Sequence, residues 1–338
     1  MRSWNPDFLD GYETTELALP GVEPASGEPA DVEFVATLVR RVPEGAGSCR
    51  AVLYLHGWND YFFQTHLADF LSALGFDFYA LDLRRYGRSL RRGHHRGFIT
   101  DLDEYAVELD AAAEVILTDH DEFVLMGHST GGLVGALWAS RRPEGLSAVI
   151  LNSPWLDLQG SALVRTLGAP VIEALGSRNP TSVVRLPDLG FYARTLHSTL
   201  GGEWDYDLEL KLTPSPPVRV GWLRAVLIGH QRVAAGLGIE VPILVLASTA
   251  TDFSRRWHEG LRTVDTVLDV EQIAARAVRL GRHVTVVRID EGMHDLVLSA
   301  PRVRQRTFAE ITRFVEAYAK SPTKIAKSVS EPTSTLVR

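Results

Sequence analysis

The ten residues FVLMGHSTGG, at positions 123–132, run from an apolar stretch straight into a serine flanked by glycines. Packing alone would favour an apolar residue where Ser129 stands, and an ordinary turn would favour Asn, Asp or Pro. Gly-x-Ser-x-Gly between a strand and a helix is instead typical of a nucleophile elbow, a sharp turn that strains the serine backbone and exposes its hydroxyl. The flanking glycines leave room for the neighbouring strand and helix. Ser129 is therefore the predicted nucleophile.

Segments of strand and helix character alternate on both sides of this motif. Uninterrupted apolar runs, such as AVLYLHG at 51–57, are typical of strands in a sheet that is covered on both faces. Helical spacing of Leu67, Leu71 and Leu74 indicates a helix. The repeated order of strand, helix and strand predicts an α/β fold with a parallel sheet. Strands are expected at 16–20, 32–41, 49–57, 76–84, 123–127 and 146–154, and helices at 64–75, 101–119 and 131–142.

The alternation stops after Pro154 and resumes near residue 240. The residues between, 155–239, combine helical patches with an aromatic stretch and the breaker TPSPP. This composition predicts an inserted, mostly helical cap subdomain.

The rest of the chain is expected to form one core with two loose ends. Strands at 241–248 and 283–292 and a helix at 301–320 complete a core made of residues 1–154 and 240–320. Within that core, the first fifteen residues predict a loosely attached arm. Residues 321–338 are rich in Ser, Thr, Pro and Lys, which predicts a disordered tail.

Composition and charge indicate a globular protein that does not bind nucleic acid. The 338 residues are 45% hydrophobic and 23% charged, which is ordinary for a globular chain with a large core. The formal net charge is -7, and the basic residues do not build a general polyanion-binding face, so nucleic acid is not an expected partner. The arginines and histidines between Arg84 and His95 are predicted to form a solvated loop, with a phosphate or carboxylate site as the alternative.

The location of the protein is predicted from what the sequence lacks. Cys49 is the only cysteine, so no intramolecular disulfide and no cysteine-based metal site is expected. The first twenty residues do not have the basic-then-apolar order of a signal peptide. No apolar run approaches the ~20 residues of a membrane span. A cytoplasmic protein without an integral membrane segment is the prediction.

A serine nucleophile needs a base to accept its proton, and the base needs an acid to orient it. His294 stands after the last expected strand, where the base belongs, whereas His56 and His128 are expected to point elsewhere. The acid should follow the strand at 241–248.

Three aspartates are candidates for the acid. Asp265 is favoured, because the residues after it predict a turn into a helix and its distance along the chain to His294 is the more usual one. Asp252 is the alternate, because it directly follows the strand, and Asp269 is the third candidate.

An acyl-transfer site also needs N–H donors for the oxyanion. The backbone N–H of Thr130, directly after the nucleophile, is one expected donor. The other is the N–H of Trp58, in the loop LHGWND at 55–60, where Gly57 permits the turn.

Four pieces now stand in one order: LHGWND at 55–60, DLRRYGRS at 82–89, GHSTGG at 127–132 and EGMH at 291–294. Together they resemble the α/β-hydrolase superfamily, closest to its branch of monoacylglycerol lipases, lysophospholipase-like hydrolases and serine aminopeptidases. The resemblance covers residues ~30–155 and ~240–320. It implies a serine hydrolase with a mostly parallel central sheet, helices on both faces and a cap over the site.

The chain departs from the pattern of this branch in two places. Arg85 replaces the usual glycine of Asp-x-Arg-Gly-x-Gly-Arg-Ser. The usual strand-Gly-x-x-Asp motif of the acid is interrupted by an apparent insertion at 251–264.

The predicted activity is hydrolysis of carboxylic esters with medium or lipid-like acyl chains, such as monoacylglycerols or lysophospholipids. An acyl-enzyme would form on Ser129, and no metal or cofactor is required. The partner is a small-molecule ester, held by a cap whose apolar residues can line an acyl pocket.

Two alternatives stay open. An aminopeptidase or amidase would need an acidic pocket, for which Glu203, Asp205 and Asp207 are candidates. A ligand sensor or weakly active scaffold on the same fold is the alternative outside enzymes. Dehalogenase and epoxide-hydrolase chemistry is disfavoured, because those enzymes have Asp where this chain has Ser129.

Overall fold

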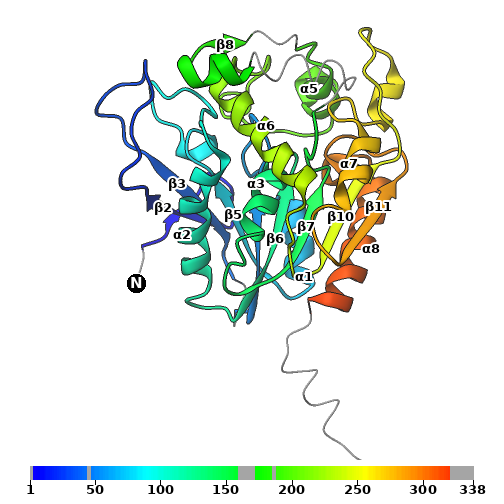
Figure 1. The fold of residues 1–338 in the computed structure, drawn as a ribbon. Coiled ribbons are helices and arrows are strands. Elements are labelled where there is room, and N and C mark those ends of the chain that lie inside the picture. Colours follow the sequence, from blue (N-terminus) through cyan, green and yellow to red (C-terminus); the bar gives the residue numbers. More distant parts are fainter. Residues whose placement is uncertain (1–2, 44–46, 159–171, 185–187, 320–338) are drawn as a thin grey trace, which may run out of the picture.

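The protein is built around one large sheet, seen here in a computed structural model that describes residues 3–43, 47–158, 172–184 and 188–319. Within these residues nine strands pair in the order β1-β2-β3-β5-β4-β6-β7-β10-β11 (Figure 1). Every neighbouring pair from β5 to β11 is parallel, whereas β1, β2 and β3 are antiparallel additions at one edge. The prediction of a mostly parallel α/β sheet is confirmed. The predicted tail at 321–338 lies outside the described residues.

The strands of the parallel part are buried over most of their length, except the last strand at the edge of the sheet, which is half-buried. From Ala51 to Leu55 in β4, for example, every side chain is fully buried. This burial explains why the strands are apolar throughout instead of alternating with polar residues. In sheet order, the parallel strands are β5 (Asp77–Asp82), β4 (Arg50–Leu55), β6 (Glu122–His128), β7 (Leu146–Asn152), β10 (Ile243–Ser248) and β11 (Val284–Ile289).

Helices cover both faces of the sheet, and each face has its own apolar core. On one face, α1 (Thr65–Ala73) and α8 (Pro301–Tyr318) pack over the sheet. The other face is covered by α2 (Ala106–Ile116), α3 (Thr130–Ala139), α6 (Val220–Ala235) and α7 (Val270–Ala277). The short 3₁₀ turn η2 (Leu102–Tyr105) precedes α2, so the helix expected at 101–119 is tighter at its start.

The N-terminal residues are part of the sheet, and the prediction of a loosely attached arm is wrong. The strands β1 (Asn5–Pro6) and β2 (Tyr12–Ala18) pair with each other, and β2 pairs along its whole length with β3 (Val35–Arg41). Between β1 and β2, the Asp7 carboxylate forms an ion pair with Arg88 at 2.7 Å. The polar residues that suggest an arm belong to the exposed edge strand β1, to the exposed positions of β2 and to this buried ion pair.

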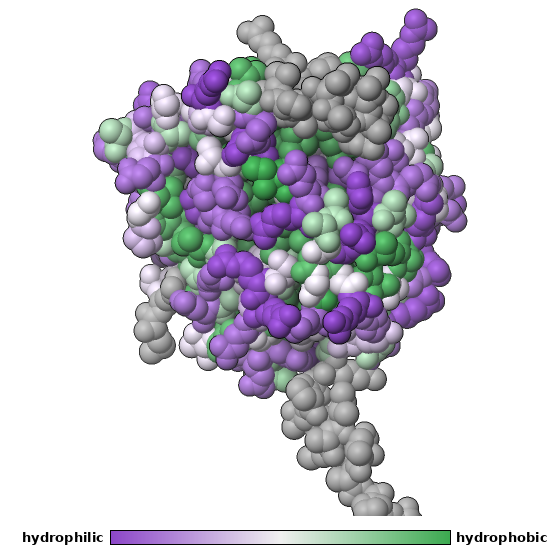
Figure 2. All heavy atoms as spheres, in the orientation of Figure 1, coloured by the Kyte–Doolittle hydropathy of each residue, from purple (hydrophilic) through white to green (hydrophobic). Residues whose placement is uncertain are grey.

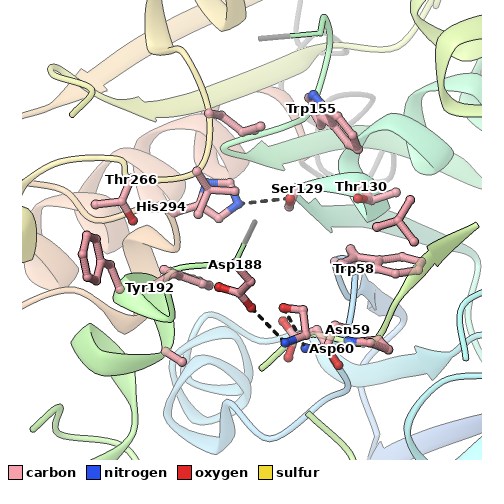
Figure 3. Close-up of a pocket in the computed structure, with 18 of the residues that line it drawn as sticks. Trp58, Asn59, Asp60, Ser129, Thr130, Trp155, Asp188, Tyr192, Thr266 and His294 are labelled. Atoms are coloured by element: carbon pink, nitrogen blue, oxygen red, sulfur yellow. Dashed lines mark hydrogen bonds between the residues drawn. The ribbon is translucent and has the colours of Figure 1, made fainter. Parts of the chain in front are cut away.

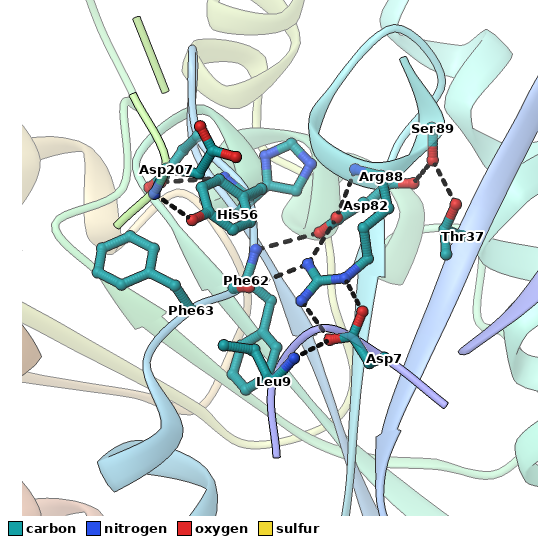
Figure 4. Close-up of polar contacts among 12 residues, drawn as sticks. Asp7, Leu9, Thr37, His56, Phe62, Phe63, Asp82, Arg88, Ser89 and Asp207 are labelled. Atoms are coloured by element: carbon teal, nitrogen blue, oxygen red, sulfur yellow. Dashed lines mark hydrogen bonds and ion pairs between the residues drawn. The ribbon is translucent and has the colours of Figure 1, made fainter. Parts of the chain in front are cut away.

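The basic segment after β5 is a network of ion pairs, so the prediction of a solvated loop is wrong for its first arginines. Arg88 lies between Asp7 and Asp82 and donates hydrogen bonds to both (Figure 4). Arg84 pairs at 2.7 Å with Glu108 of α2. These partners already neutralise the guanidinium groups, so neither a solvated loop nor an anion site describes them.

Arg85, which replaces the usual glycine of the branch, has a φ of 65° in the left-handed region. Its guanidinium forms an ion pair with Glu28 at 2.6 Å and stacks over the Phe34 ring. Burial alone would raise the pKa of Glu28. The hydrogen bonds from Arg85 and from the Ala25 and His95 N–H groups outweigh it and lower this pKa to about 2. The side chain of Arg85 therefore holds the chain before β3 against the core and compensates for the backbone conformation.

The described parts of the segment between β7 and β10 lie mainly at the end of the sheet where the parallel strands finish, and α6 extends from there over α3 (Figure 1). Its described elements include α5 (Phe191–Leu196), the long helix α6 and the small pair of strands β8 (Val183–Val184) and β9 (Val218–Arg219). Helix α6 packs on α3 and η2. These elements lie within residues 155–239, the range of the predicted cap.

The face of the molecule shown in Figure 2 is mainly hydrophilic, with hydrophobic residues in separate patches. In the described part of the chain, no helix has both the length and the apolar character that crossing a bilayer requires.

Candidate active site

Ser129 stands at the sharp turn between β6 and α3. Its φ of 53° and ψ of −118° lie outside the regions that non-glycine residues ordinarily occupy. A Cβ atom on Gly127 would lie 2.7 Å from the carbonyl oxygen of Gly131, and one on Gly131 would lie 2.2 Å from the carbonyl oxygen of His56. The backbone therefore has the strained geometry of a nucleophile elbow, and only glycine fits on either side.

The side chains of Ser129, His294 and Asp265 form a chain of two hydrogen bonds. His294 Nε2 lies 3.0 Å from Ser129 Oγ (Figure 3), and His294 Nδ1 lies 2.9 Å from Asp265 Oδ2. The other carboxylate oxygen, Asp265 Oδ1, accepts hydrogen bonds from the N–H groups of Val267 and Leu268 at 2.8 and 2.7 Å. With this carboxylate as acceptor, Nδ1 carries the imidazole proton and Nε2 is left to accept from the serine hydroxyl.

Asp265 reaches His294 because the chain leaves the end of β10 and returns to it. Thr251 and Asp265 pair in a parallel bridge, and the Asp265 N–H donates to the Ala250 carbonyl at 2.9 Å. The Asp252 N–H in turn donates to the Asp265 carbonyl at 3.0 Å. Residues 252–264 are thus an excursion, and Asp265 lies beside the strand end as if the excursion were absent.

The other two candidate acids have local partners instead. Asp252 is partly exposed, accepts a hydrogen bond from the Ser254 N–H at 2.8 Å and lies 3.1 Å from His258 Nε2. Asp269 caps α7 by accepting from the Glu271 N–H at 3.0 Å. Of the three aspartates, Asp265 is the one that the structure brings into hydrogen-bonding contact with His294.

Two buried ionisable groups, to which the sequence analysis assigns no role in the site, lie beside this chain of hydrogen bonds. The ring of His128 lies 4.9 Å from that of His294, and burial together with the charge of His294 lowers the pKa of His128 to about 3. The fully buried Asp295 accepts a hydrogen bond from Asn152 Nδ2 at 2.7 Å, and burial raises its pKa. Adjacency to Ser129 and His294 is the only signal that the sequence holds for either group.

The loop after β4 passes close to Ser129. A Cβ atom on Gly57 would lie 3.1 Å from Ser129 Cβ, so the absence of a side chain allows this approach. His56 points away, as expected, and accepts a hydrogen bond from the Leu83 N–H at 3.1 Å. Trp58 and Thr130 both line the cavity beside Ser129 (Figure 3). Among the described residues, the backbone N–H of neither Trp58 nor Thr130 has a hydrogen-bond acceptor, which is the state an oxyanion hole requires.

Ser129 and His294 open into a cavity of about 1770 Å³. This exceeds the ~300–1,000 Å³ of most small-molecule sites. Three indole rings form one wall, since Trp222 lies 4.1 Å from Trp58 and 5.8 Å from Trp155 between ring centroids. The apolar lining includes Leu158, Val184, Leu189, Phe191, Leu212, Leu223, Phe253, Val267 and Leu268. Among the described residues, no group of three His, Cys, Asp or Glu side chains is arranged to hold a metal ion.

The fold is shared with solved lipases. The monoacylglycerol lipase from Paleococcus ferrophilus superposes with a TM-score of 0.63 at 19% identity, over 84% of this chain and 98% of that one. A soluble variant of monoglyceride lipase from Saccharomyces cerevisiae superposes with a TM-score of 0.65 at 14% identity, over 92% of this chain and 97% of that one. At these identities the likeness defines the fold, which is the α/β-hydrolase fold expected from the sequence.

Sequence comparison narrows the class to one family. The chain is 28% identical over 202 residues to a monoacylglycerol lipase from Mycolicibacterium smegmatis, which is 59% of this chain and 66% of that protein. The matched segments span 34–66% of the curated relatives' own lengths. The sequence pattern of serine aminopeptidase, S33, matches residues 47–298. The chain therefore belongs to the serine aminopeptidase S33 family, and the predicted resemblance is confirmed.

Proposed function

We propose that this protein is a serine hydrolase that cleaves carboxylic esters with medium or lipid-like acyl chains. The observation that carries the proposal is the hydrogen-bonded chain Ser129–His294–Asp265 at the edge of a large, mostly apolar cavity. Relatives named as monoacylglycerol lipase and phospholipase support the same class of substrate.

In the proposed reaction, Ser129 Oγ attacks the ester carbonyl while His294 Nε2 takes its proton. Asp265 holds the imidazole in the tautomer that can accept this proton and stabilises the imidazolium that forms. The N–H groups of Trp58 and Thr130 donate to the oxyanion of the tetrahedral intermediate. His294 then protonates the leaving alcohol, an acyl-enzyme results, and water activated by His294 releases the acid.

We also propose that residues 155–239 act as a cap whose inner surface sorts substrates. Helix α6 supplies Trp222 and Leu223 to the cavity wall, and α5 supplies Phe191 and Tyr192. Each methylene buried against such a wall contributes about 0.8 kcal/mol, or roughly a fourfold change in binding. Residues 1–154 and 240–320 form the catalytic core in this proposal, and a cytoplasmic location stays a prediction.

An aminopeptidase or amidase on the same site is less well supported. Glu203, Asp205 and Asp207, the predicted acidic candidates, are not among the described residues that line the cavity. Asp205 accepts a hydrogen bond from Ser198, and Glu203 lies 3.7 Å from Arg304. These local partners favour a structural role over recognition of a substrate ammonium group.

The test is hydrolysis of p-nitrophenyl esters from acetyl to palmitoyl, with monoacylglycerols and aminoacyl anilides in parallel. We expect sustained ester turnover that falls by on the order of 10⁴-fold or more in Ser129→Ala. Ser140→Ala is the matched control, because the Ser140 hydroxyl bonds to the Leu137 carbonyl at the far end of α3. Retained turnover in Ser129→Ala would contradict the assigned nucleophile.

The same assay separates the alternatives. Preferential cleavage of the anilides would establish the amidase instead. A burst without sustained turnover would favour a ligand sensor. Labelling of Ser129 by a fluorophosphonate probe without turnover of any ester would mean that the lipid-ester proposal is wrong although the nucleophile is competent.

A further inference from the structure

The loop after β4 is tied to the cap by a pair of backbone-directed hydrogen bonds. Asn59 Nδ2 donates to the carbonyl oxygen of Leu212 at 2.8 Å, and the Leu212 N–H donates to Asn59 Oδ1 at 3.0 Å. The Asn59 side chain thus bonds to both the N–H and the C=O group of Leu212, as the backbone of a neighbouring strand would. We call this contact the Asn59–Leu212 pair. It joins segments that are 153 residues apart in the sequence.

The residues on either side of Asn59 also contact the cap. Asp60 Oδ1 forms a buried ion pair with Lys211 Nζ at 2.7 Å, and the Trp58 ring packs against the Trp222 ring of α6, with 4.1 Å between the centroids and 43° between the ring planes. Three consecutive residues of the loop are therefore held by the cap.

Trp58 carries the N–H group that the proposed function assigns to the oxyanion hole. That N–H has no hydrogen-bond acceptor among the described residues, so no bond of its own fixes its direction. Donors of this kind accelerate a reaction only when they are held in place before charge develops. The orientation of the Trp58 N–H therefore depends on what holds the residues beside it.

We propose that Asn59 is a positioning residue, which fixes the Trp58 N–H through the Asn59–Leu212 pair and so makes the oxyanion hole depend on the cap. This inference rests on the proposed function. The competing explanation is local, because Asn59 has a φ of 50° and asparagine tolerates the left-handed region better than most residues.

Asn59→Gly separates the two explanations. Glycine adopts the same φ without strain, so the loop conformation stays accessible, but both hydrogen bonds to Leu212 are lost. Asn59→Asp is an isosteric second variant that keeps the acceptor and replaces the donor by an oxygen facing the Leu212 carbonyl. Tyr61→Phe is the matched control, because it removes a different hydrogen bond between core and cap, the one that the Asp207 N–H donates to the Tyr61 hydroxyl at 2.8 Å.

Two readouts distinguish positioning from general loosening of the structure. The first is kcat against KM for the p-nitrophenyl ester that the wild type cleaves best. The second is the affinity for an alkyl trifluoromethyl ketone, which forms a tetrahedral oxyanion adduct on the serine and is followed by ¹⁹F NMR without any turnover. Misplacing a catalytic group by about 1 Å costs up to about 100-fold in rate.

We expect Asn59→Gly to lower kcat by about 10- to 100-fold, to leave KM within about twofold and to weaken the ketone adduct by a similar factor. Asn59→Asp should change both readouts in the same direction, and Tyr61→Phe should change neither. Wild-type kcat and ketone affinity in Asn59→Gly would overturn the proposal, as would an equal loss in Tyr61→Phe. Absence of ester turnover by the wild type rejects the proposed function, whereas the ketone adduct still tests the role of Asn59.

Discussion

Replacing Asp265 by asparagine changes one atom and is expected to remove most of the activity. Asp265 Oδ1 accepts two backbone N–H groups, at 2.8 and 2.7 Å, and an amide nitrogen cannot take that place. The asparagine must therefore turn its oxygen toward Val267 and Leu268 and its NH₂ group toward His294 Nδ1. Nδ1 then has to accept, so the ring proton moves to Nε2, the atom that should receive the proton of Ser129.

The size of the loss follows from this change of tautomer. A base that carries its proton on the wrong nitrogen loses about 10⁴-fold in kcat in comparable triads. That factor corresponds to about 5 kcal/mol of transition-state stabilisation, at about 1.4 kcal/mol for each tenfold. Substrate binding does not use Asp265, which is fully buried behind His294, so KM should change little.

Asp252→Asn is the matched control for this substitution. Asp252 is partly exposed and lies 3.1 Å from His258, and its loss should leave kcat within about twofold of the wild type. Steady-state hydrolysis of a p-nitrophenyl ester, with melting temperatures to verify folding, measures both variants. A folded Asp265→Asn enzyme with more than about a tenth of wild-type kcat, or a larger loss in Asp252→Asn, would refute this assignment of the acid.

Three further substitutions test the packing and the charges of the fold. Gly131→Ala would place a methyl group 2.2 Å from the His56 carbonyl oxygen, so we expect a lower melting temperature and no turnover, and wild-type values would contradict the close approach. Burial lowers the pKa of His230 from 6.5 to about 4, so as pH falls through this range the unfolded state binds the proton first. Stability should then fall by up to about 1.4 kcal/mol per pH unit, and urea unfolding of His230→Asn should show a shallower decline than the wild type; equal slopes would exclude this role. Arg85→Gly relieves a φ of 65° but leaves the buried Glu28 carboxylate without its ion-pair partner, so the free energy of unfolding should drop by about 3–5 kcal/mol. Adding Glu28→Gln should restore most of that loss, and no recovery would mean that the ion pair is not the cause.

The parts of the site that depend on local pattern could be predicted from the sequence. Ser129 follows a strand and precedes a helix within a glycine-rich motif, and His294 follows the last strand, so each is marked by its own neighbours. The acid is harder to predict from the sequence, because the excursion at 252–264 separates Asp265 along the chain from the strand that it adjoins in space. The bridge to Thr251 that resolves this ambiguity is a tertiary contact without a sequence signature.

The errors and omissions have the same physical origin. The composition of the N-terminal residues and of the basic segment predicts the wrong structure, because their charges are neutralised by residues far away in the chain, such as Asp7 for Arg88. Because a sequence does not show the ion-pair partner of a charged residue, such a residue is predicted to be exposed to solvent. The contact of Asn59 with Leu212 could not be predicted from the sequence for a similar reason. Asn59 bonds to the backbone of residue 212, and every residue type except proline offers the same two backbone groups.

The excursion at 252–264 contributes to the lining of the cavity but not to the hydrogen bonds between Ser129, His294 and Asp265. Its ends are anchored by the Thr251–Asp265 bridge, and its body touches none of the hydrogen bonds between Ser129, His294 and Asp265. Phe253 and Ser254, within it, nevertheless line the cavity. Substitutions at these two residues would therefore reshape the cavity wall without removing a hydrogen bond between Ser129, His294 and Asp265.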